Sequence, residues 1–115
     1  MPLKLPAYIA HRGLSAYAPE NTLEAFELAR LQSYSMFECD VQLTKEGVPV
    51  IVHDDIKGFR AKAMSGFPSL QAVLAWMSRN TMLMNLELKG LQENLCLEIE
   101  KVLKPYLSIL KERIN

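Results

Sequence analysis

The sequence has little cysteine, no surplus of charge of either sign and no long apolar run. Its 115 residues include only two cysteines, Cys39 and Cys96, which lie far apart among apolar neighbours. We therefore expect both to be reduced and to lie in the core, as is usual in cytoplasmic proteins. Thirteen basic residues balance thirteen acidic ones, and no basic cluster stands out, which argues against nucleic acid as a partner.

No segment is apolar over the length that a transmembrane helix requires. The first ten residues contain Pro2, Lys4 and Pro6 and lack the apolar stretch of a secretory signal peptide. We therefore expect a cytoplasmic protein. Low-complexity segments and convincing internal repeats are also missing, while half of the residues are apolar. A chain of this size and composition can form one core, so we expect a single domain over residues 1–115.

The most informative stretch covers residues 36–54 and predicts two strands joined by a tight turn. Polar and apolar residues alternate in its first part. Because successive side chains of a strand point to opposite faces, Glu38, Asp40 and Gln42 should share one face. The chemistry of this face is the starting point for every functional prediction below.

The second part of this stretch, residues 48–53, is a nearly continuous apolar run, as in a buried strand. The four-residue link before it is too short for a parallel crossover, so we predict a β-hairpin. A turn centred on the middle of this link would place Glu38 opposite His53 and Asp40 opposite Ile51. Two carboxylates and an imidazole would then share one small area.

The rest of the chain predicts further strands and helices in alternation. We expect strands at residues 7–10 and 81–89, an exposed loop at 54–67, and helices that start at Asn21, cover 70–77 and 92–104, and end the chain at 106–114. The order strand, helix, hairpin, helix, strand, helix is typical of α/β proteins. In βα folds the chemistry lies at the carboxyl ends of the strands, where most of the polar clusters fall here.

Three carboxylates, on Glu38, Asp40 and Glu87, are expected on one inner surface. Burying three negative charges together is unfavourable unless a cation neutralises them. Oxygen ligands suit a hard divalent ion, Mg²⁺ or Ca²⁺, and no cysteine or histidine cluster has the spacing of a zinc site. The alternative is a solvated polar face of a strand.

The only two histidines, His11 and His53, each end a predicted strand. A histidine pair beside a metal suits acid–base catalysis near neutral pH. Arg12 and Lys89 add positive charge suited to a phosphate group. Structural alternatives stay open, because a histidine at a strand end can be purely structural and Arg12 can simply pair with a carboxylate.

Six short motifs, in their order and spacing, resemble the glycerophosphodiester phosphodiesterase family. They are His11-Arg12-Gly13, Pro19-Glu20-Asn21-Thr22, Glu38-x-Asp40-Val41, Thr44-Lys45-Glu46-Gly47, Val52-His53-Asp54 and Leu86-Glu87-Leu88-Lys89. The resemblance is strongest over residues 8–54 and fades after Lys89. Family members usually carry a longer segment after the His-Asp pair, and here only residues 56–67 stand in its place.

The resemblance implies an α/β fold: the first half of a TIM-type βα-barrel with a β-hairpin between the second and third strands. It implies a phosphoric diester hydrolase of lipid and glycerol metabolism, which hydrolyses glycerophosphodiesters to glycerol 3-phosphate and an alcohol. By position, it implies Glu38, Asp40 and Glu87 as ligands of a divalent cation (Mg²⁺ or Ca²⁺), His11 and His53 as the acid–base pair, and Arg12 and Lys89 as phosphate contacts.

Length limits what this resemblance can cover. A full (β/α)₈ barrel takes about 250 residues, so residues 1–115 would form one truncated domain, up to the fourth strand and its helix. Open sheet edges are unfavourable in water, so we expect two copies to associate and cover them. Two alternatives are a non-catalytic relative that binds a metal, a phosphate ligand or a protein partner, and a shortened product that folds marginally. A phospholipase-type barrel with the same two-histidine chemistry is a third functional alternative.

Overall fold

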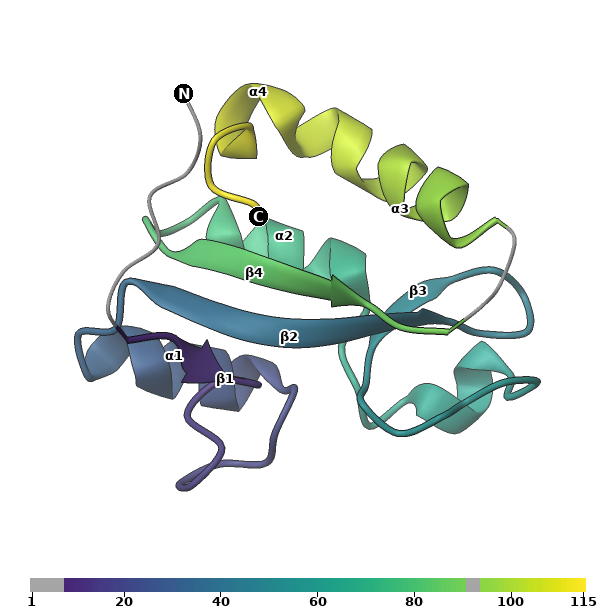
Figure 1. Cartoon of the computed structure of the whole chain (residues 1–115), viewed down its shortest axis with the longest axis horizontal. Helices are drawn as coiled ribbons and strands as arrows, with labels where there is room; N and C mark the ends of the chain where they lie inside the picture. The colour runs from purple at the N-terminus through teal and green to yellow at the C-terminus, as the bar shows by residue number, and fades with distance from the viewer. Residues whose placement is uncertain (1–7, 91–93) are drawn as a thin grey trace.

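The computed structural model describes residues 8–90 and 94–115, and its centre is a sheet (Figure 1). The longest strand, β2 (Met36–Leu43), pairs with all the others. Strands β1 (Ala10–His11) and β4 (Leu83–Leu88) run parallel to it on opposite edges, and β3 (Pro49–Ile51) is antiparallel to it. The parallel order β1–β2–β4 confirms the predicted half of a βα-barrel.

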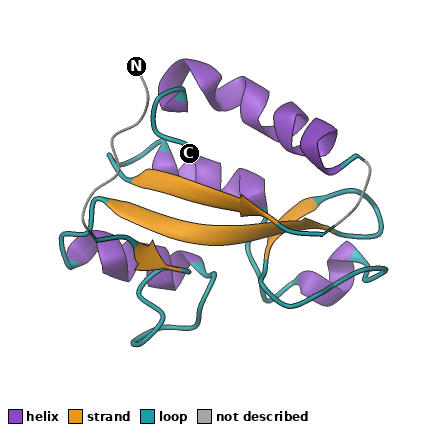
Figure 2. Ribbon diagram, in the orientation of Figure 1, coloured by secondary structure: helices purple, strands orange, loops and turns teal. Residues whose placement is uncertain are grey.

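Helices cover one face of this sheet and form the main core with it (Figure 2). They are α1 (Leu23–Leu31), α2 (Leu70–Met77), α3 (Leu95–Leu103), a 3₁₀ turn at Lys104–Tyr106, and α4 (Leu107–Leu110). Phe37, Cys39 and Val41 point from β2 into this core, where Phe26 and Trp76 stack against Phe37. The alternation in β2 therefore leaves its other face free for polar side chains.

Helix α2 has the predicted bounds, because Ser69 caps it by accepting a hydrogen bond from the backbone N–H of Ala72 at 3.1 Å. The predicted cap of the first helix was wrong. Thr22, not Asn21, is the N-cap of α1, and its hydroxyl accepts from the backbone N–H of Ala25 at 3.2 Å. The side chain of Asn21 is used elsewhere, as described below.

The predicted hairpin of β2 and β3 forms, but its register differs by one residue. Val41, not Asp40, lies opposite Ile51. The N–H of Thr44 donates to the carbonyl of Val48 at 3.0 Å, so the loop has three residues and ends at Gly47 with φ +83°. A three-residue loop with glycine in the left-handed region is a common hairpin connection. Glu38 and His53 are therefore not cross-strand partners.

The segment at 54–67 was expected to be an exposed loop, and this was wrong in part. It contains a short 3₁₀ helix, Ala61–Met64, and two buried side chains. Ile56 and Met64 pack on Val50 and Val52 to form a second, smaller cluster. This cluster lies apart from the main core and anchors the segment that follows His53.

The end of the chain also differs from the predicted helix at 106–114. Helix α4 ends at Leu110, and Ile114 forms a parallel bridge with Met84 of β4. The guanidinium of Arg113 fixes this turn by donating to the carbonyls of Met77 and Met82 at 2.9 and 2.7 Å. The chain thus supplies three parallel barrel strands, β1, β2 and β4, because β3 is antiparallel, and a single bridge at Ile114 stands where a helix was expected.

Other expectations concern single residues and segment ends. Cys39 is buried as predicted, whereas Cys96 is exposed on α3, so its predicted place in the core was wrong. Both thiols are free. The predicted strand at 7–10 and helix at 92–104 lie partly outside the described residues. Within the described part of the chain, no helix combines the length and the apolar character needed to span a membrane.

Candidate functional site

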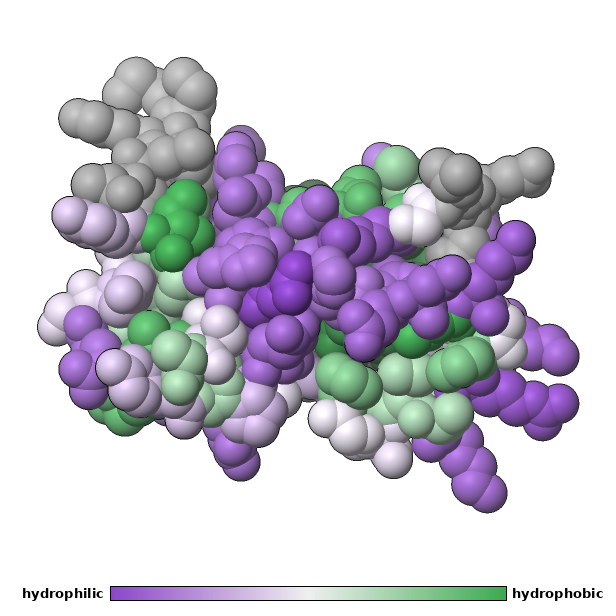
Figure 3. All heavy atoms as spheres, turned by 60° about the horizontal axis from the view of Figure 1, so that its bottom comes forward, coloured by the Kyte–Doolittle hydropathy of each residue, from purple (hydrophilic) through white to green (hydrophobic). Residues whose placement is uncertain are grey.

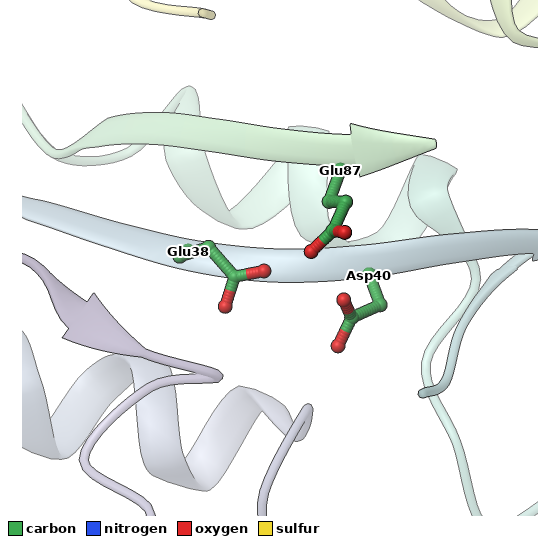
Figure 4. Close-up of side chains that lie close together, drawn as sticks. All are labelled: Glu38, Asp40 and Glu87. Atoms are coloured by element: carbon green, nitrogen blue, oxygen red, sulfur yellow. The ribbon is translucent and has the colours of Figure 1, made fainter. Parts of the chain in front are cut away.

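Glu38 and Asp40 of β2 and Glu87 of β4 converge on the sheet face opposite the main core (Figure 4). Asp40 lies directly opposite Glu87 in the parallel ladder, and one oxygen of each of the three carboxylates lies within 4.8 Å of the others. Glu38 and Asp40 are buried, whereas Glu87 is exposed. Like charges directly opposite each other destabilise a sheet, so this arrangement favours a bound cation.

Each buried carboxylate has one oxygen held by the protein and one that is not. The Oε2 atom of Glu38 accepts from the backbone N–H of Arg12 at 3.1 Å and lies 3.5 Å from Nε2 of His11. The Oδ2 atom of Asp40 accepts from the amide of Asn21 at 3.0 Å and lies 3.2 Å from Nε of Arg12. The other two oxygens are buried and lack a hydrogen-bond partner within residues 8–90 and 94–115. Such orphaned acceptors fit a metal site.

The electrostatics of Glu38 agree with this geometry. Burial raises the pKa of its carboxyl from 4.5 to about 7, and the negative charges of Asp40 and Glu87 add to the shift. The hydrogen bond from the backbone of Arg12 opposes it. Near neutral pH the carboxylate of Glu38 therefore needs a positive partner to stay ionised, and a divalent cation would supply one.

A strained turn after β1 brings the positive groups to the carboxylates. Arg12 and Asn21 both have φ +56°, a conformation that non-glycine residues adopt only rarely. The carbonyl of Arg12 accepts from the N–H of Asn21 at 2.9 Å, which links the two ends of this turn. The guanidinium of Arg12 lies between Asp40 and Glu20, at 3.2 and 3.1 Å. It thus pairs with carboxylates, the structural alternative expected for it.

The two histidines differ in their surroundings. The imidazole of His11 is 67% exposed and points its Nε2 towards Glu38. The imidazole of His53 is 33% exposed, and its Nδ1 lies 3.2 Å from a carboxylate oxygen of Asp54. The Nζ atom of Lys89 lies 4.0 Å from Oε1 of Glu87. A space-filling view shows hydrophilic residues gathered across the middle of one face of the molecule (Figure 3).

Sequence reasoning missed two buried amides beside these groups. Asn21 was interpreted as a helix cap, yet it holds Asp40 through its Nδ2 and Oδ1 atoms at 3.0 and 3.3 Å. Gln42 was placed on the correct face of β2, but nothing in the alternation indicated that it binds the segment after β3. A polar residue on the same face as two predicted ligands was the one available signal.

The parallel strands with helices on one face define part of a βα-barrel, and the acidic side chains of two neighbouring strands form a cluster that could hold a cation. Comparisons with known proteins show which proteins the chain resembles. The profile of the glycerophosphoryl diester phosphodiesterase family matches residues 11–59. The Bacillus subtilis protein YhdW is 60% identical over 47 residues, which are 41% of this chain and 19% of YhdW. The glycerophosphodiester phosphodiesterase of Caldanaerobacter subterraneus is 51% identical over 47 residues, with the same shares.

Solved structures extend this likeness to nearly the whole chain. A phosphodiesterase from Oleispira antarctica, solved in complex with the product sn-glycerol 3-phosphate, is 30% identical with a TM-score of 0.73. The alignment covers 96% of this chain and 54% of that one. The chain therefore spans about half the length of the solved proteins it matches. It resembles glycerophosphodiester phosphodiesterases over about half of the length of the solved proteins.

Proposed function

We propose that this chain carries the cation-binding and acid–base groups of a phosphodiesterase that hydrolyses glycerophosphodiesters to glycerol 3-phosphate and an alcohol. The observation that carries the proposal is that the two oxygens of each buried carboxylate, on Glu38 and on Asp40, are bonded differently. Each gives one oxygen to the protein and keeps one without a partner. The complex of the Oleispira relative with sn-glycerol 3-phosphate supports the substrate class.

In this proposal Glu38, Asp40 and Glu87 hold a divalent cation, either Mg²⁺ or Ca²⁺, because all three donors are carboxylate oxygens. When bound, the cation supplies Lewis-acid polarisation of the phosphate group. The side chain of Glu87 is exposed, so a ligand can reach the site from solvent through this residue. The proton on Glu38 must leave when the cation binds, since the metal ligand is the ionised carboxylate.

His11 and His53 move the protons. One imidazole removes a proton from the attacking oxygen and the other protonates the leaving alcohol oxygen. If the attacking oxygen belongs to water, glycerol 3-phosphate forms directly; if it is a glycerol hydroxyl, a cyclic phosphodiester forms, and water must open it in a second step of the same kind. His11 is already oriented by Glu38, which lies 3.5 Å from its Nε2. The nearby carboxylate of Asp54 orients the Nδ1 side of His53. Either histidine can take either role in this geometry.

Arg12 and Lys89 are proposed to contact the substrate phosphate, because both lie beside the acidic residues. Lys89 is 4.0 Å from Glu87, and Arg12 is shared between Asp40 and Glu20. A bidentate guanidinium suits a phosphate, as it suits a carboxylate. In the proposed complex Arg12 would exchange its contact with the exposed carboxylate of Glu20 for the substrate.

The test is release of glycerol 3-phosphate from glycerophosphocholine by the full chain, with Mg²⁺ and with Ca²⁺. Activity is expected to disappear with EDTA, with His11→Ala and with Glu38→Gln. Glu112→Gln removes a carboxylate on the exposed surface near the C-terminus and should leave activity unchanged. Turnover that persists in EDTA, or in Glu38→Gln, would contradict the proposed mechanism.

The half-length match favours a second candidate, a relative that binds a cation or phosphate ligand without turnover. The relatives contain a further half that this chain does not cover, and that half includes the other barrel strands. Cation binding measured by calorimetry, together with no hydrolysis of any diester across several divalent ions, would support this candidate over the enzyme.

We also propose that a second copy of the chain covers the open edge of β1. Within the described residues, β1 pairs with β2 alone. A surface groove between the loop that follows β1 and the C-terminal part of α1 is lined by Leu14, Tyr17, Leu28, Gln32 and Tyr34. An unpaired strand edge can accept a strand from another chain, and in this proposal a second copy supplies it. A cytoplasmic location and the absence of nucleic acid as a partner stay predictions from composition.

A further inference from the structure

The side chain of Gln42 is buried and binds the segment that carries His53. Its Nε2 donates to the carbonyls of Val52, His53 and Asp54 at 2.9, 3.1 and 2.7 Å. Its Oε1 accepts from the N–H of Ile56 at 3.3 Å. An amide has two N–H groups, so one of them is shared between carbonyls. Every hydrogen-bonding function of this amide is directed at one short stretch of chain.

This stretch has little else to fix it close to the carboxylates. The N–H of Val52 donates to the carbonyl of Asp40 at 2.9 Å, the last ladder contact before the chain leaves the sheet. Beyond it, Ile56 packs into the small cluster with Val50 and Val52. The imidazole of His53 is in contact with Asp54, the residue next to it, and this neighbour is itself exposed. The place of the imidazole thus depends on its backbone, and Gln42 holds that backbone on both sides.

We infer that Gln42 is a positioning residue: it sets the distance between the His53 imidazole and the Glu38–Asp40 carboxylates without touching the substrate. Gln42 stands two residues after Asp40 on the same face of β2. One strand therefore carries two of the proposed cation ligands and the support of one proposed acid–base group. The inference rests on the proposed function for its catalytic consequence, but the structural coupling between Gln42 and His53 is testable without it.

The test variant is Gln42→Glu, which keeps the size of the side chain and the acceptor for the N–H of Ile56. It replaces the amide donor by a carboxylate oxygen that repels three carbonyls. Gln71→Glu makes the same change of charge on the exposed side of α2 and serves as the matched control. If Gln42→Glu does not fold, Gln42→Met removes the donor without adding charge and takes its place.

The first readout is the NMR spectrum of the histidine rings. His11 and His53 are the only histidines, so two signals are expected and His11 is an internal reference. Gln42→Glu should shift or broaden the His53 signal and leave that of His11 unchanged. Gln71→Glu should change neither signal. A His53 signal equal to that of the control in a folded Gln42 variant would overturn the inference.

The second readout separates positioning from substrate binding. The kcat for glycerophosphocholine should fall between about tenfold and a hundredfold, as expected for a misplaced catalytic group, while KM changes little. A loss of kcat/KM that comes from a higher KM alone, with kcat unchanged, would overturn the positioning role. If the wild-type chain shows no turnover, the proposed enzymatic function fails, and the ring signals still decide whether Gln42 positions His53.

Discussion

Within the site, the two carboxylates on β2 differ in how the protein satisfies them. Asp40 receives an amide and a guanidinium, whereas Glu38 receives a single backbone N–H and a histidine. The pKa of Glu38 is raised to about 7 by burial and by neighbouring negative charge.

The raised pKa of Glu38 predicts how stability depends on pH in EDTA. The folded chain binds this proton more tightly than the unfolded chain, so protonation of Glu38 stabilises the folded state. This stabilisation is complete below the ordinary pKa of 4.5 and is lost as pH rises through about 7. Glu38→Gln cannot ionise. We therefore expect its melting temperature, relative to that of the wild type, to rise between pH 4.5 and 8, by about 4 °C for each kcal/mol of change.

Thermal unfolding of both proteins at pH 4.5, 6 and 8 measures this difference. Comparing the two proteins at each pH cancels the titration of other groups, such as Glu46, whose pKa is lowered by the N–H of Ala61. A difference that stays constant across this range would show that Glu38 ionises normally in the folded chain.

Among the elements, the connection between β1 and α1 packs tightly against the helix at Gly13. Gly13 has φ +81°, and a Cβ added there would lie 2.5 Å from Cβ of Ala25. Gly58, in the segment after β3, has φ +82°, and an added Cβ would meet nothing within 4 Å. The two glycines share a backbone conformation and differ in their surroundings, so comparing them separates strain from collision.

Substituting each glycine by alanine tests this packing. Gly58→Ala should lower the free energy of unfolding by about 1–2 kcal/mol, the strain of a left-handed alanine. Gly13→Ala should lower it by about 1–3 kcal/mol more, since the loop must move away from α1. Urea denaturation measures both. Equal losses at the two positions would mean that α1 yields to the added methyl group.

The elements that sequence patterns predict best are those set by neighbours along the chain. Alternation in β2 and β4 placed Glu38, Asp40 and Glu87 on one face, and Ser69 marked the start of α2. Predictions failed where a distant residue decided the outcome. Asn21 and Thr22 are both good caps, and Asp40, 19 residues away, takes the first of them.

Similar long-range contacts explain the other differences. The helical pattern near the C-terminus continues past Leu110, but Ile114 pairs with Met84 instead. The segment at 54–67 mixes charged and apolar residues without a regular period, and the partners of its two buried side chains, Ile56 and Met64, include Val50 and Val52 of the hairpin. Gly47 sets the hairpin register, because its left-handed conformation closes a three-residue loop. The residue composition of the link does not distinguish this loop from a longer turn.

For the whole molecule, the open edge of β1 predicts self-association. Light scattering at micromolar concentration should give twice the 13.0 kDa of one chain. Tyr17, in the loop that follows β1, lines a surface groove and is 80% exposed. Tyr17→Asp should therefore favour the monomer without unfolding it, because burying a charge at an interface is unfavourable. Leu97→Asp, on the exposed side of α3, is the control. A wild-type mass of one chain would contradict the dimer.

The unpartnered oxygens of Glu38 and Asp40 also bear on how much folded protein a cell would contain. A cation that binds only the folded chain stabilises it by about 2.7 kcal/mol at a hundred times its dissociation constant. If the proposed site binds its ion, a shortage of that ion would first increase the unfolded fraction, which proteases remove. The supply of divalent ions would then control how much of this protein is present, as well as the turnover rate of each folded molecule.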